Sequence, residues 1–588
     1  MESGSPTTCV CGFGPSSPGA EALPFRLGGR RPALSTYCCN IAAERSLARH
    51  PGRSARLAVG ILLLAAVAIA GALVPAAAET VRGVEVEAVA KGGLPGYAPG
   101  SGVDAAAARR ISRWALAEYG VPGAAVALVQ DGRVVLAEGF GVRDQSTGAP
   151  TTADTVFQLA SVSKTFTAAT VAALVERKRL GWEQPMVALL PAFRLADAYA
   201  GRWVNARDLL THRAGFPAFF GDLFDHLGYN RVDVLRRIRY VQPATSFRDR
   251  PAYSNIGFFL AGELAAKAGG LPFAELARSL IFTPLAMTRT GIASSLIGDG
   301  AGPGALEDVS RSHAVVNGRL QVVPPNLSAL FIAAGGFASS ASDLSRFVAL
   351  LTRGGELDGR RVLSEVAVKE LFEPVIAEEP GFAEFPPIDA NSGFDYSPGW
   401  GVYHYNGLKV LEKGGALDGV RTLLLLVPQK RFGVVVLANR NLTALPEAVR
   451  AALLQQAFGR PGEADLQPQI RVRSRQLEGM LLAVAPRPAN PKPPARPLAA
   501  YAGSFSNDLF GRWTIAEQGG ALEVLAGPAR YRAALTPWNG ETFHLLWPGV
   551  ISSPVEVPFQ ADRSGRVVSF DYLGYRFSRE AAPGPGAP

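Results

Sequence analysis

Ser161 and Lys164 are residues whose types and spacing could carry out chemistry together. They stand at the start of an apolar run, residues 162–177, with few Gly or Pro residues, which predicts a mostly buried helix. Residues three apart share a helix face, so the Lys164 amine can reach the Ser161 hydroxyl. A desolvated lysine beside other cations is neutral enough to take the proton of a serine and make it a nucleophile. Taken alone, however, the pattern fits a helix-capping serine and a solvated lysine better.

Tyr253 and Asn255 form a second candidate pair, in a polar loop that precedes an apolar helix starting at Ile256. A tyrosine phenolate held near a lysine can act as general base and return the proton to a leaving group. The asparagine amide can orient the lysine or a substrate amide. The alternative for this pair alone is a tyrosine that packs on the helix.

Lys413, Gly414, Gly415 and Ala416 form the third pattern, between two apolar runs, residues 408–411 and 420–427, that predict neighbouring strands. Glycines let a substrate backbone lie against a strand. Lys413 supplies positive charge for a carboxylate or a developing oxyanion, and an N–H after the glycines can be an oxyanion donor together with the start of the Ser161 helix. A bulged hairpin is the alternative for this motif alone.

Together, Ser-x-x-Lys, Tyr-x-Asn and Lys-Gly-Gly resemble the motifs of the serine β-lactamase and penicillin-binding peptidase superfamily, most closely its class C and esterase branch. The resemblance spans residues 121–442 and includes the stretches VPGAAVALVQDGRVV, DLLTHRAGFP and AAGGFASSASDLSRF. It implies an acyl-enzyme hydrolase with these site residues: Ser161 as nucleophile, Lys164 and Tyr253 as the base pair, Asn255, Lys413 and Gly415 as substrate-binding or electrostatic groups, and the N–H groups of Ser161 and Ala416 as the oxyanion hole.

Two departures from the family patterns bear on the substrate. Tyr253 stands where class A enzymes have a serine, and Gly414 lacks the hydroxyl that a threonine offers to a substrate carboxylate. The predicted substrates are therefore small acyl esters or D-amino-acid amides and peptides, with cell-wall D-Ala peptides and β-lactams as alternatives. A non-catalytic sensor of peptidoglycan or β-lactams is the rival from another class. An aromatic trio, Phe216, Phe219 and Phe220, could line the pocket or only pack.

Composition excludes several other functions. The chain has 588 residues, 48% of them hydrophobic, and a net charge of +9. No block of Lys and Arg stands out in the folded part, so no nucleic-acid partner is expected. The six histidines are scattered without ligand spacing, which predicts no metal or other cofactor. His212, in the Thr-His-Arg-Ala-Gly segment, is expected to be a structural hydrogen-bonding residue.

The N-terminal part of the sequence predicts export. Residues 1–56 form a disordered or mis-started leader that holds all four cysteines, and residues 57–74 carry no charge. Small residues before Glu79 predict that 57–78 is a signal peptide cleaved after Ala78; the alternative is a retained membrane anchor. The protein is thus expected to be periplasmic or extracellular, in contact with cell-wall material or, if uncleaved, with the membrane. Residues 79–103 form a connector.

The hydrolase domain, residues 104–465, is predicted to have an α+β fold. A helix capped by Asp104 precedes a hairpin at Asp131-Gly132, and strands return after Gly399, so the antiparallel sheet uses both ends of the domain. Residues 185–330 alternate helical patterns with Pro and Gly loops and predict a helical subdomain. A helix over 446–458 is expected to close the sheet. Ser161 and Tyr253 then lie in the helical region and Lys413 at the sheet edge, with the pocket between them.

The C-terminal part is a separate predicted domain. Residues 466–497 form a helical segment and a proline-rich linker. Residues 498–583 show short alternating runs that predict an antiparallel barrel or sandwich. They resemble the lipocalin-like appendage of some esterases and D-aminopeptidases, which could shape substrate access, bind cell-wall or lipid material, or only stabilise the fold.

Overall fold

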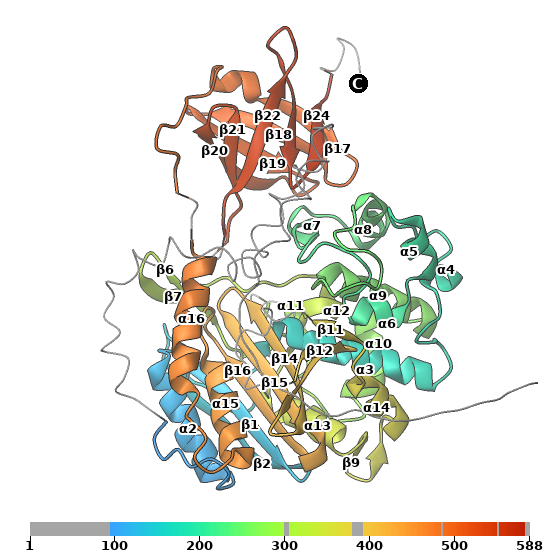
Figure 1. Cartoon of the computed structure of the whole chain (residues 1–588), viewed down its shortest axis with the longest axis vertical. Coiled ribbons are helices and arrows are strands. Elements are labelled where there is room, and N and C mark those ends of the chain that lie inside the picture. Colours follow the sequence, from blue (N-terminus) through green and yellow to red (C-terminus); the bar gives the residue numbers. More distant parts are fainter. Residues whose placement is uncertain (1–93, 299–304, 379–391, 484–485, 550–551, 582–588) are drawn as a thin grey trace, which may run out of the picture. The chain divides into compact units, whose positions relative to one another are not determined.

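The computed structural model describes residues 94–298, 305–378, 392–483, 486–549 and 552–581 (Figure 1). The predicted leader with its cysteines, the signal or anchor segment 57–78 and most of the connector lie outside these residues. None of the described helices combines the length and the apolar character that crossing a bilayer requires.

A large antiparallel sheet lies at the centre of the hydrolase domain. Within the described residues nine strands form it, in the order β11-β12-β13-β14-β15-β16-β1-β2-β3. Their bounds are β1 Gly123–Gln130, β2 Arg133–Asp144, β3 Ala149–Pro150, β11 Ile376–Glu378, β12 Phe394–Ser397, β13 Trp400–Tyr405, β14 Leu408–Leu417, β15 Val420–Val427 and β16 Phe432–Ala438. Because β1 pairs with β16, the sheet is built from both ends of the domain, as the sequence predicted.

The predicted hairpin joins β1 and β2. Asp131 and Gly132 both have positive φ, 49° and 70°, which is the backbone of the two-residue turn that an Asp-Gly pair favours. Side chains of β1 alternate between the two faces of the sheet. Val126 and Leu128 belong to one buried cluster, whereas Ala125 and Ala127 belong to another, so both faces of this strand are covered.

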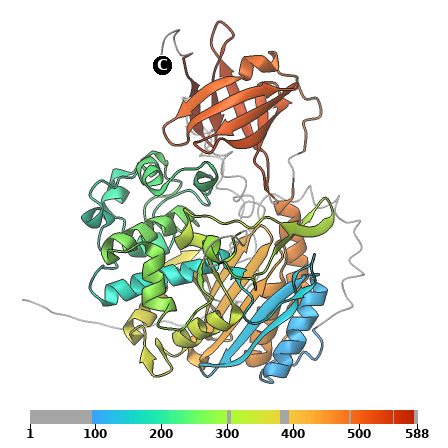
Figure 2. The same cartoon turned by 180° about the vertical axis from the view of Figure 1, so that it is seen from behind.

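Helices cover the two faces (Figures 1 and 2). On the face of Val126, α2 (Ala105–Glu118) packs beside α15 (Leu445–Phe458), and α16 (Gln467–Leu481) lies against α15. The carboxylate of Asp104 caps α2 by accepting from Ala107 N–H at 2.7 Å, which confirms the predicted cap. On the other face lie α3 (Ser163–Glu176) and α13 (Ala341–Thr352).

The predicted helical subdomain is confirmed between α3 and α13, with short strands that the sequence did not predict. Its elements between α3 and α13 are α4 Met186–Leu189, α5 Ala198–Trp203, α6 Ala206–Leu210, α7 Leu223–His226, α8 Arg231–Arg237, η3 Ile238–Tyr240, α9 Asn255–Gly269, α10 Phe273–Ala277, η4 Arg278–Phe282, β5 Gly291–Ile292, α11 Ala293–Leu296, β6 Ser312–Val316, β7 Arg319–Val323, α12 Ile332–Gly335 and β8 Phe337–Ser339. Two short elements precede α3: β4 Phe157–Gln158 and η2 Ala160–Val162. After α13 come β9 Glu356–Leu357, β10 Arg360–Arg361 and α14 Glu365–Phe372.

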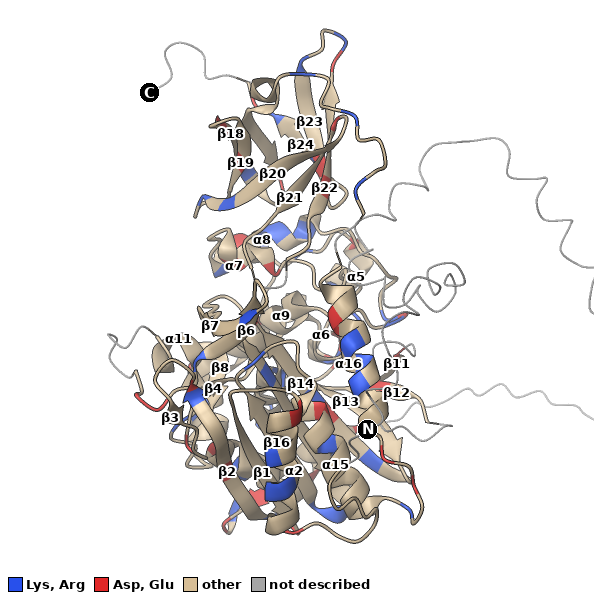
Figure 3. Cartoon of the chain, turned by 90° about the vertical axis from the view of Figure 1, so that its left-hand side faces the viewer, with Lys and Arg blue, Asp and Glu red and all other residues tan. Residues whose placement is uncertain are grey.

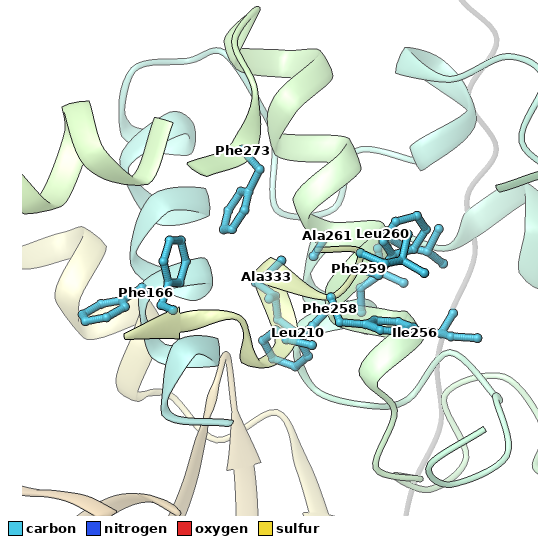
Figure 4. Packing of buried hydrophobic residues seen from close by; sticks show 14 of the residues in the cluster. Phe166, Leu210, Ile256, Phe258, Phe259, Leu260, Ala261, Phe273 and Ala333 are labelled. Atoms are coloured by element: carbon cyan, nitrogen blue, oxygen red, sulfur yellow. The ribbon is translucent and has the colours of Figure 1, made fainter. Parts of the chain in front are cut away.

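Aromatic packing fixes α3 in this subdomain. Phe166 is fully buried and meets the rings of Phe282 and Phe347 edge-on, each with a centroid distance of 4.8 Å. Figure 4 shows Phe166 on α3 and the apolar side chains that α9 contributes, among them Phe258 and Phe259. Such close packing holds a helix in one position. The residues at the start of α3 are therefore carried on a rigid support.

The C-terminal domain is a closed antiparallel barrel, not a sandwich. Its eight described strands are β17 Gly503–Asn507, β18 Gly511–Gln518, β19 Ala521–Ala526, β20 Tyr531–Asn539, β21 Thr542–Leu546, β22 Val555–Ala561, β23 Val567–Tyr572 and β24 Tyr575–Arg579, preceded by a short helical turn, η6 Leu498–Tyr501. Pairing of β17 with β24 closes the barrel. Fully buried aromatic side chains such as Trp513 and Phe577, whose rings lie 4.5 Å apart, fill the interior.

Candidate active site

Ser161 lies in the short turn η2, immediately before α3. Ala160 has a φ of 50°, an uncommon conformation for a residue with a Cβ. Strand β14 approaches this turn closely: a Cβ on Gly415 would lie 2.5 Å from the Leu159 carbonyl oxygen and 3.0 Å from Ser161 N. Only glycine fits at position 415, so its absent side chain lets the strand meet the backbone of the nucleophile turn.

Lys164 is fully buried one turn further along. Its Nζ lies 3.2 Å from Ser161 Oγ, 2.6 Å from Asn255 Oδ1 and 2.8 Å from the Ala334 carbonyl oxygen. Burial, and then the positive charge of Lys413, lowers the pKa of Lys164 well below its usual value. A neutral amine has two N–H groups and one lone pair. With both N–H groups donated to the two carbonyl oxygens, the lone pair is left for the Ser161 hydroxyl proton.

Tyr253 approaches Ser161 from the loop before α9. Its hydroxyl lies 2.7 Å from Ser161 Oγ and can donate to it. Burial raises the pKa of Tyr253 far above its usual value, so the phenol is neutral in the free protein. The sequence predicted Lys164 and Tyr253 as the base pair, and the structure places both within hydrogen-bond distance of Ser161 Oγ.

Lys413 lies on β14 above the ring of Tyr253, with Nζ 4.7 Å from the ring centroid. Burial lowers the pKa of Lys413 to about 8, although Glu378 and Glu412 oppose this shift. The prediction that Lys413 stands at the sheet edge is wrong, because β14 is an interior strand. Its pairing with β13 nevertheless ends at Glu412, which lies opposite Gly401, one residue before Lys413.

The Lys-Gly-Gly motif is part of β14, whereas the sequence had predicted that the strand ends at Leu411. Residues 413–417 pair with β15 and not with β13, so the β13 side of this segment faces the cavity. Gly414 and Ala416 line that cavity. An added Cβ on Gly414 would meet only the Thr422 carbonyl oxygen, at 3.8 Å. There is thus room along this segment for a substrate backbone.

Asp222 belongs to the site although sequence reasoning missed it. Both of its carboxylate oxygens accept from the Nδ2 group of Asn255, at 3.0 and 2.9 Å. This fixes the amide of Asn255 with its oxygen toward Lys164. Burial raises the pKa of Asp222 to about 6, against the lowering effects of Asn255 and Lys164. No spacing rule could have found it, since the contact joins residues 33 positions apart.

Asp222→Asn is expected to lower kcat about tenfold, because Asn255 loses the charged acceptor that orients it. The acid limb of the pH–rate profile should also move to lower pH. The Asp222 carboxylate raises the pKa of Lys164, so removing its charge makes Lys164 easier to deprotonate. Steady-state kinetics between pH 4 and pH 10 would measure both effects. Asp225→Asn, in the same cavity, is the charge-matched control; an equal shift in both variants would contradict the specific role of Asp222.

The candidate site opens into a cavity of about 650 Å³, a size that suits a small organic ligand. Ser161, Tyr253, Asn255 and Lys413 all line it, and Lys164 lies buried beneath them. Of the aromatic trio, only Phe219 lines the cavity, with its ring 5.0 Å from that of Tyr253.

His212 has the structural role that the sequence predicted. Its Nδ1 accepts from Ser254 N–H at 3.0 Å, and its ring lies 4.5 Å from that of Tyr253. Burial, and then the charges of Lys413 and Lys164, lowers the pKa of His212 well below its usual value. A neutral His212 therefore braces the Tyr253 loop.

The beta-lactamase family model matches residues 105–458, which include the sheet, the helical subdomain and every predicted site residue. This chain belongs to the beta-lactamase family. As a beta-lactamase-fold protein it is a serine hydrolase, which agrees with the resemblance seen in the sequence. Residues 487–581 match a domain of unknown function, DUF3471, so the lipocalin-like assignment of the barrel is not confirmed.

Relatives of this beta-lactamase-family chain carry several names. The unguisins hydrolase ungD of Aspergillus violaceofuscus is 26% identical over 68% of this chain and 74% of the relative. A D-aminopeptidase of Gluconobacter oxydans is 26% identical over 60% of this chain and 62% of that enzyme. An octameric penicillin-binding protein homologue from Pyrococcus abyssi superposes with a TM-score of 0.52 at 21% identity, covering 81% of this chain and all of that one. The last likeness concerns the fold alone.

Proposed function

We propose that this protein hydrolyses small esters, amides or D-amino-acid peptides through an acyl-enzyme on Ser161. One observation carries the proposal: Ser161 Oγ lies between a fully buried lysine amine at 3.2 Å and a phenol at 2.7 Å. A serine with only a structural role does not need a base and an acid on its two sides. The same arrangement speaks against a non-catalytic sensor.

In the proposed acylation step, neutral Lys164 takes the proton of Ser161 while Oγ forms a bond to the substrate carbonyl carbon. The N–H groups of Ser161 and Ala416 stabilise the resulting oxyanion. Tyr253 then gives its proton to the leaving amine or alkoxide as the bond to that group breaks. The proton held by Lys164 passes to Tyr253, which restores the phenol.

In the proposed deacylation step, water takes the place of the leaving group. Lys164, which is neutral again after passing its proton to Tyr253, accepts a proton from the water while the oxygen attacks the acyl carbon. The acid product leaves as Ser161 Oγ regains a proton. The positive charge of Lys413 favours both oxyanions, because it is held in a buried site where charge interacts strongly.

The substrate class is inferred from the strand segment and from the relatives. Gly414 offers no hydroxyl to a carboxylate, which ranks β-lactams below esters and D-amino-acid amides. The D-aminopeptidase among the relatives agrees with an amide substrate.

For the same chain we propose export to the periplasm or the extracellular space, on the basis of residues 57–78. A mature N-terminus at Glu79 would support cleavage, and an intact precursor at the membrane would support the anchor.

The test of substrate class is the initial rate of the wild-type chain, beside Ser161→Ala, on p-nitrophenyl butyrate, D-alanine p-nitroanilide and a chromogenic cephalosporin. Ser161-dependent turnover of the ester or the anilide, well above that of the cephalosporin, would support the proposal. A rate highest on the cephalosporin would make the protein a β-lactamase. Flat rates on all three, with equal ligand binding in both proteins, would favour the sensor.

Lys413→Arg is expected to remove the alkaline limb of the pH–rate profile. Burial holds the pKa of Lys413 at about 8, so its charge is present below pH 8 and is lost above it. A guanidinium keeps its charge through this range. In wild type kcat/KM should fall above pH 8; in the variant it should stay level to about pH 10, at a plateau lowered by the changed geometry. Lys409→Arg on the same strand is the control. A limb unchanged in Lys413→Arg would exclude Lys413 as its source.

A further inference from the structure

Helix α16 lines the catalytic cavity although it lies beyond residue 458, where the beta-lactamase match ends. Ser474, Leu477, Glu478 and Leu481 are the cavity-lining residues of this helix. Their spacing of i, i+3, i+4 and i+7 places them on a single helix face. The cavity wall on this side is therefore supplied by an element that the family model does not include.

The N-terminal half of the same face anchors α16 to the hydrolase domain. Gln467 Nε2 donates to the Ala448 carbonyl oxygen at 3.0 Å, and Ile470 packs against α15. Arg471, which is 8% exposed, forms an ion pair with Glu118 of α2 at 2.8 Å. These contacts fix the position of the helix, so that its C-terminal half extends past α15 along the cavity. Figure 3 shows α16 running beside α15, with basic positions along it and an acidic one.

Leucines from three elements line the cavity: Leu417 from β14, Leu442 from the loop before α15, and Leu477 and Leu481 from α16. Charged side chains line it as well, among them Glu478 of the same helix and Asp222 and Asp225. Residues 414–417, the strand segment that faces the cavity, lead from the turn of Ser161 to Leu417.

We propose that α16 determines specificity, with Leu477 and Leu481 binding an apolar substituent of the substrate that extends from Ser161 along β14. A cavity of about 650 Å³ is larger than a short acyl group needs, and each buried methylene adds to binding. The occupant is thus a substrate with a chain or side chain of several carbons. The inference rests on the proposed serine chemistry and adds the substrate class to it.

The test uses methylboronic and hexylboronic acid, which form reversible adducts with a nucleophilic serine and need no turnover. Their dissociation constants are measured by calorimetry with the full chain. In Leu477→Ser/Leu481→Ser, the preference for hexyl over methyl should fall about tenfold, since two apolar contacts are lost. Leu477→Phe fills space instead of opening it and should weaken hexyl binding while leaving methyl binding within about twofold.

Val472→Ser is the matched control, because Val472 is 48% exposed on the other side of the same helix. It should keep the wild-type preference. If both Leu477 variants keep the wild-type preference for hexyl over methyl while binding still depends on Ser161, the role of α16 is overturned and the proposed nucleophile stands. Absence of binding to wild type, or equal binding in Ser161→Ala, would overturn the proposed nucleophile and this inference with it.

Discussion

Ser161→Ala is expected to reduce kcat/KM on the best substrate by a factor of roughly 10⁴ to 10⁶, the range that loss of a nucleophile in a concerted site produces. The variant keeps the cavity and Lys413, so substrate binding should change little. Electrospray mass spectrometry after rapid quenching should show an acyl adduct on wild type and none on the variant. The adduct is the direct evidence, since a rate alone can reflect a contaminating enzyme.

Ser474→Ala is the control for this result, because Ser474 is another serine that lines the same cavity. Its kcat/KM should stay within about threefold of wild type. An adduct that persists in Ser161→Ala would place the nucleophile elsewhere and refute the mechanism.

Lys164→Met is expected to lower kcat by roughly 10³-fold or more, since the side chain keeps its approximate volume and loses the base. The variant also leaves the Ala334 carbonyl oxygen without its 2.8 Å donor in a buried position. An unsatisfied buried acceptor costs about 1–3 kcal/mol, but the variant also removes a desolvated amine, so the free energy of unfolding should fall by less than that amount. Pre-steady-state kinetics and urea denaturation measure the two effects.

Lys267→Met on α9 removes an exposed lysine and should alter neither quantity. If Lys164→Met kept more than about a tenth of the wild-type rate, Lys164 would not be the base, and the Tyr253 phenolate would have to take that role.

Tyr253→Phe tests whether Tyr253 acts as an acid or as a base, when the loss of rate is compared between two substrates with different leaving groups. An amide needs a proton on its departing nitrogen, whereas p-nitrophenolate leaves without one. The variant should therefore lose about 10³-fold on a D-alanine amide and about tenfold on p-nitrophenyl butyrate. Equal losses on both substrates would indicate that Tyr253 acts before the leaving group departs, as a base.

Local sequence patterns were enough for much of the fold. The Asp131-Gly132 turn, the Asp104 cap and the run 420–427 each have a short-range cause, and the structure has a turn, a cap and β15 at these places. The end of β14 was missed because glycine has a low strand propensity, so Gly414 and Gly415 suggested a break. Pairing with β15 continues through both glycines, and this tertiary contact overrides the local preference.

The site was predictable where its residues sit in fixed spacing. Ser161 and Lys164 are three apart on one turn, and Tyr253 and Asn255 flank the start of α9. Asp222 could not be found in this way, since its bond to Asn255 depends on how two loops meet. The sequence also could not show that α16 returns to the cavity, because amphipathic spacing says which face is buried and not against what.

The joining of β1 to β16 has a consequence for synthesis on the ribosome. Beside these strands the backbone N–H of Gly123 donates to the side-chain oxygen of Asn439, which lies 316 residues further along the chain. At a translation speed of about 5–20 residues per second, the β1–β2 hairpin emerges roughly 15–60 seconds before its partner strand. During this interval the apolar edge of β1 is open to other nascent chains. A chaperone that covers such edges should therefore raise the yield of folded protein more than one that acts after release.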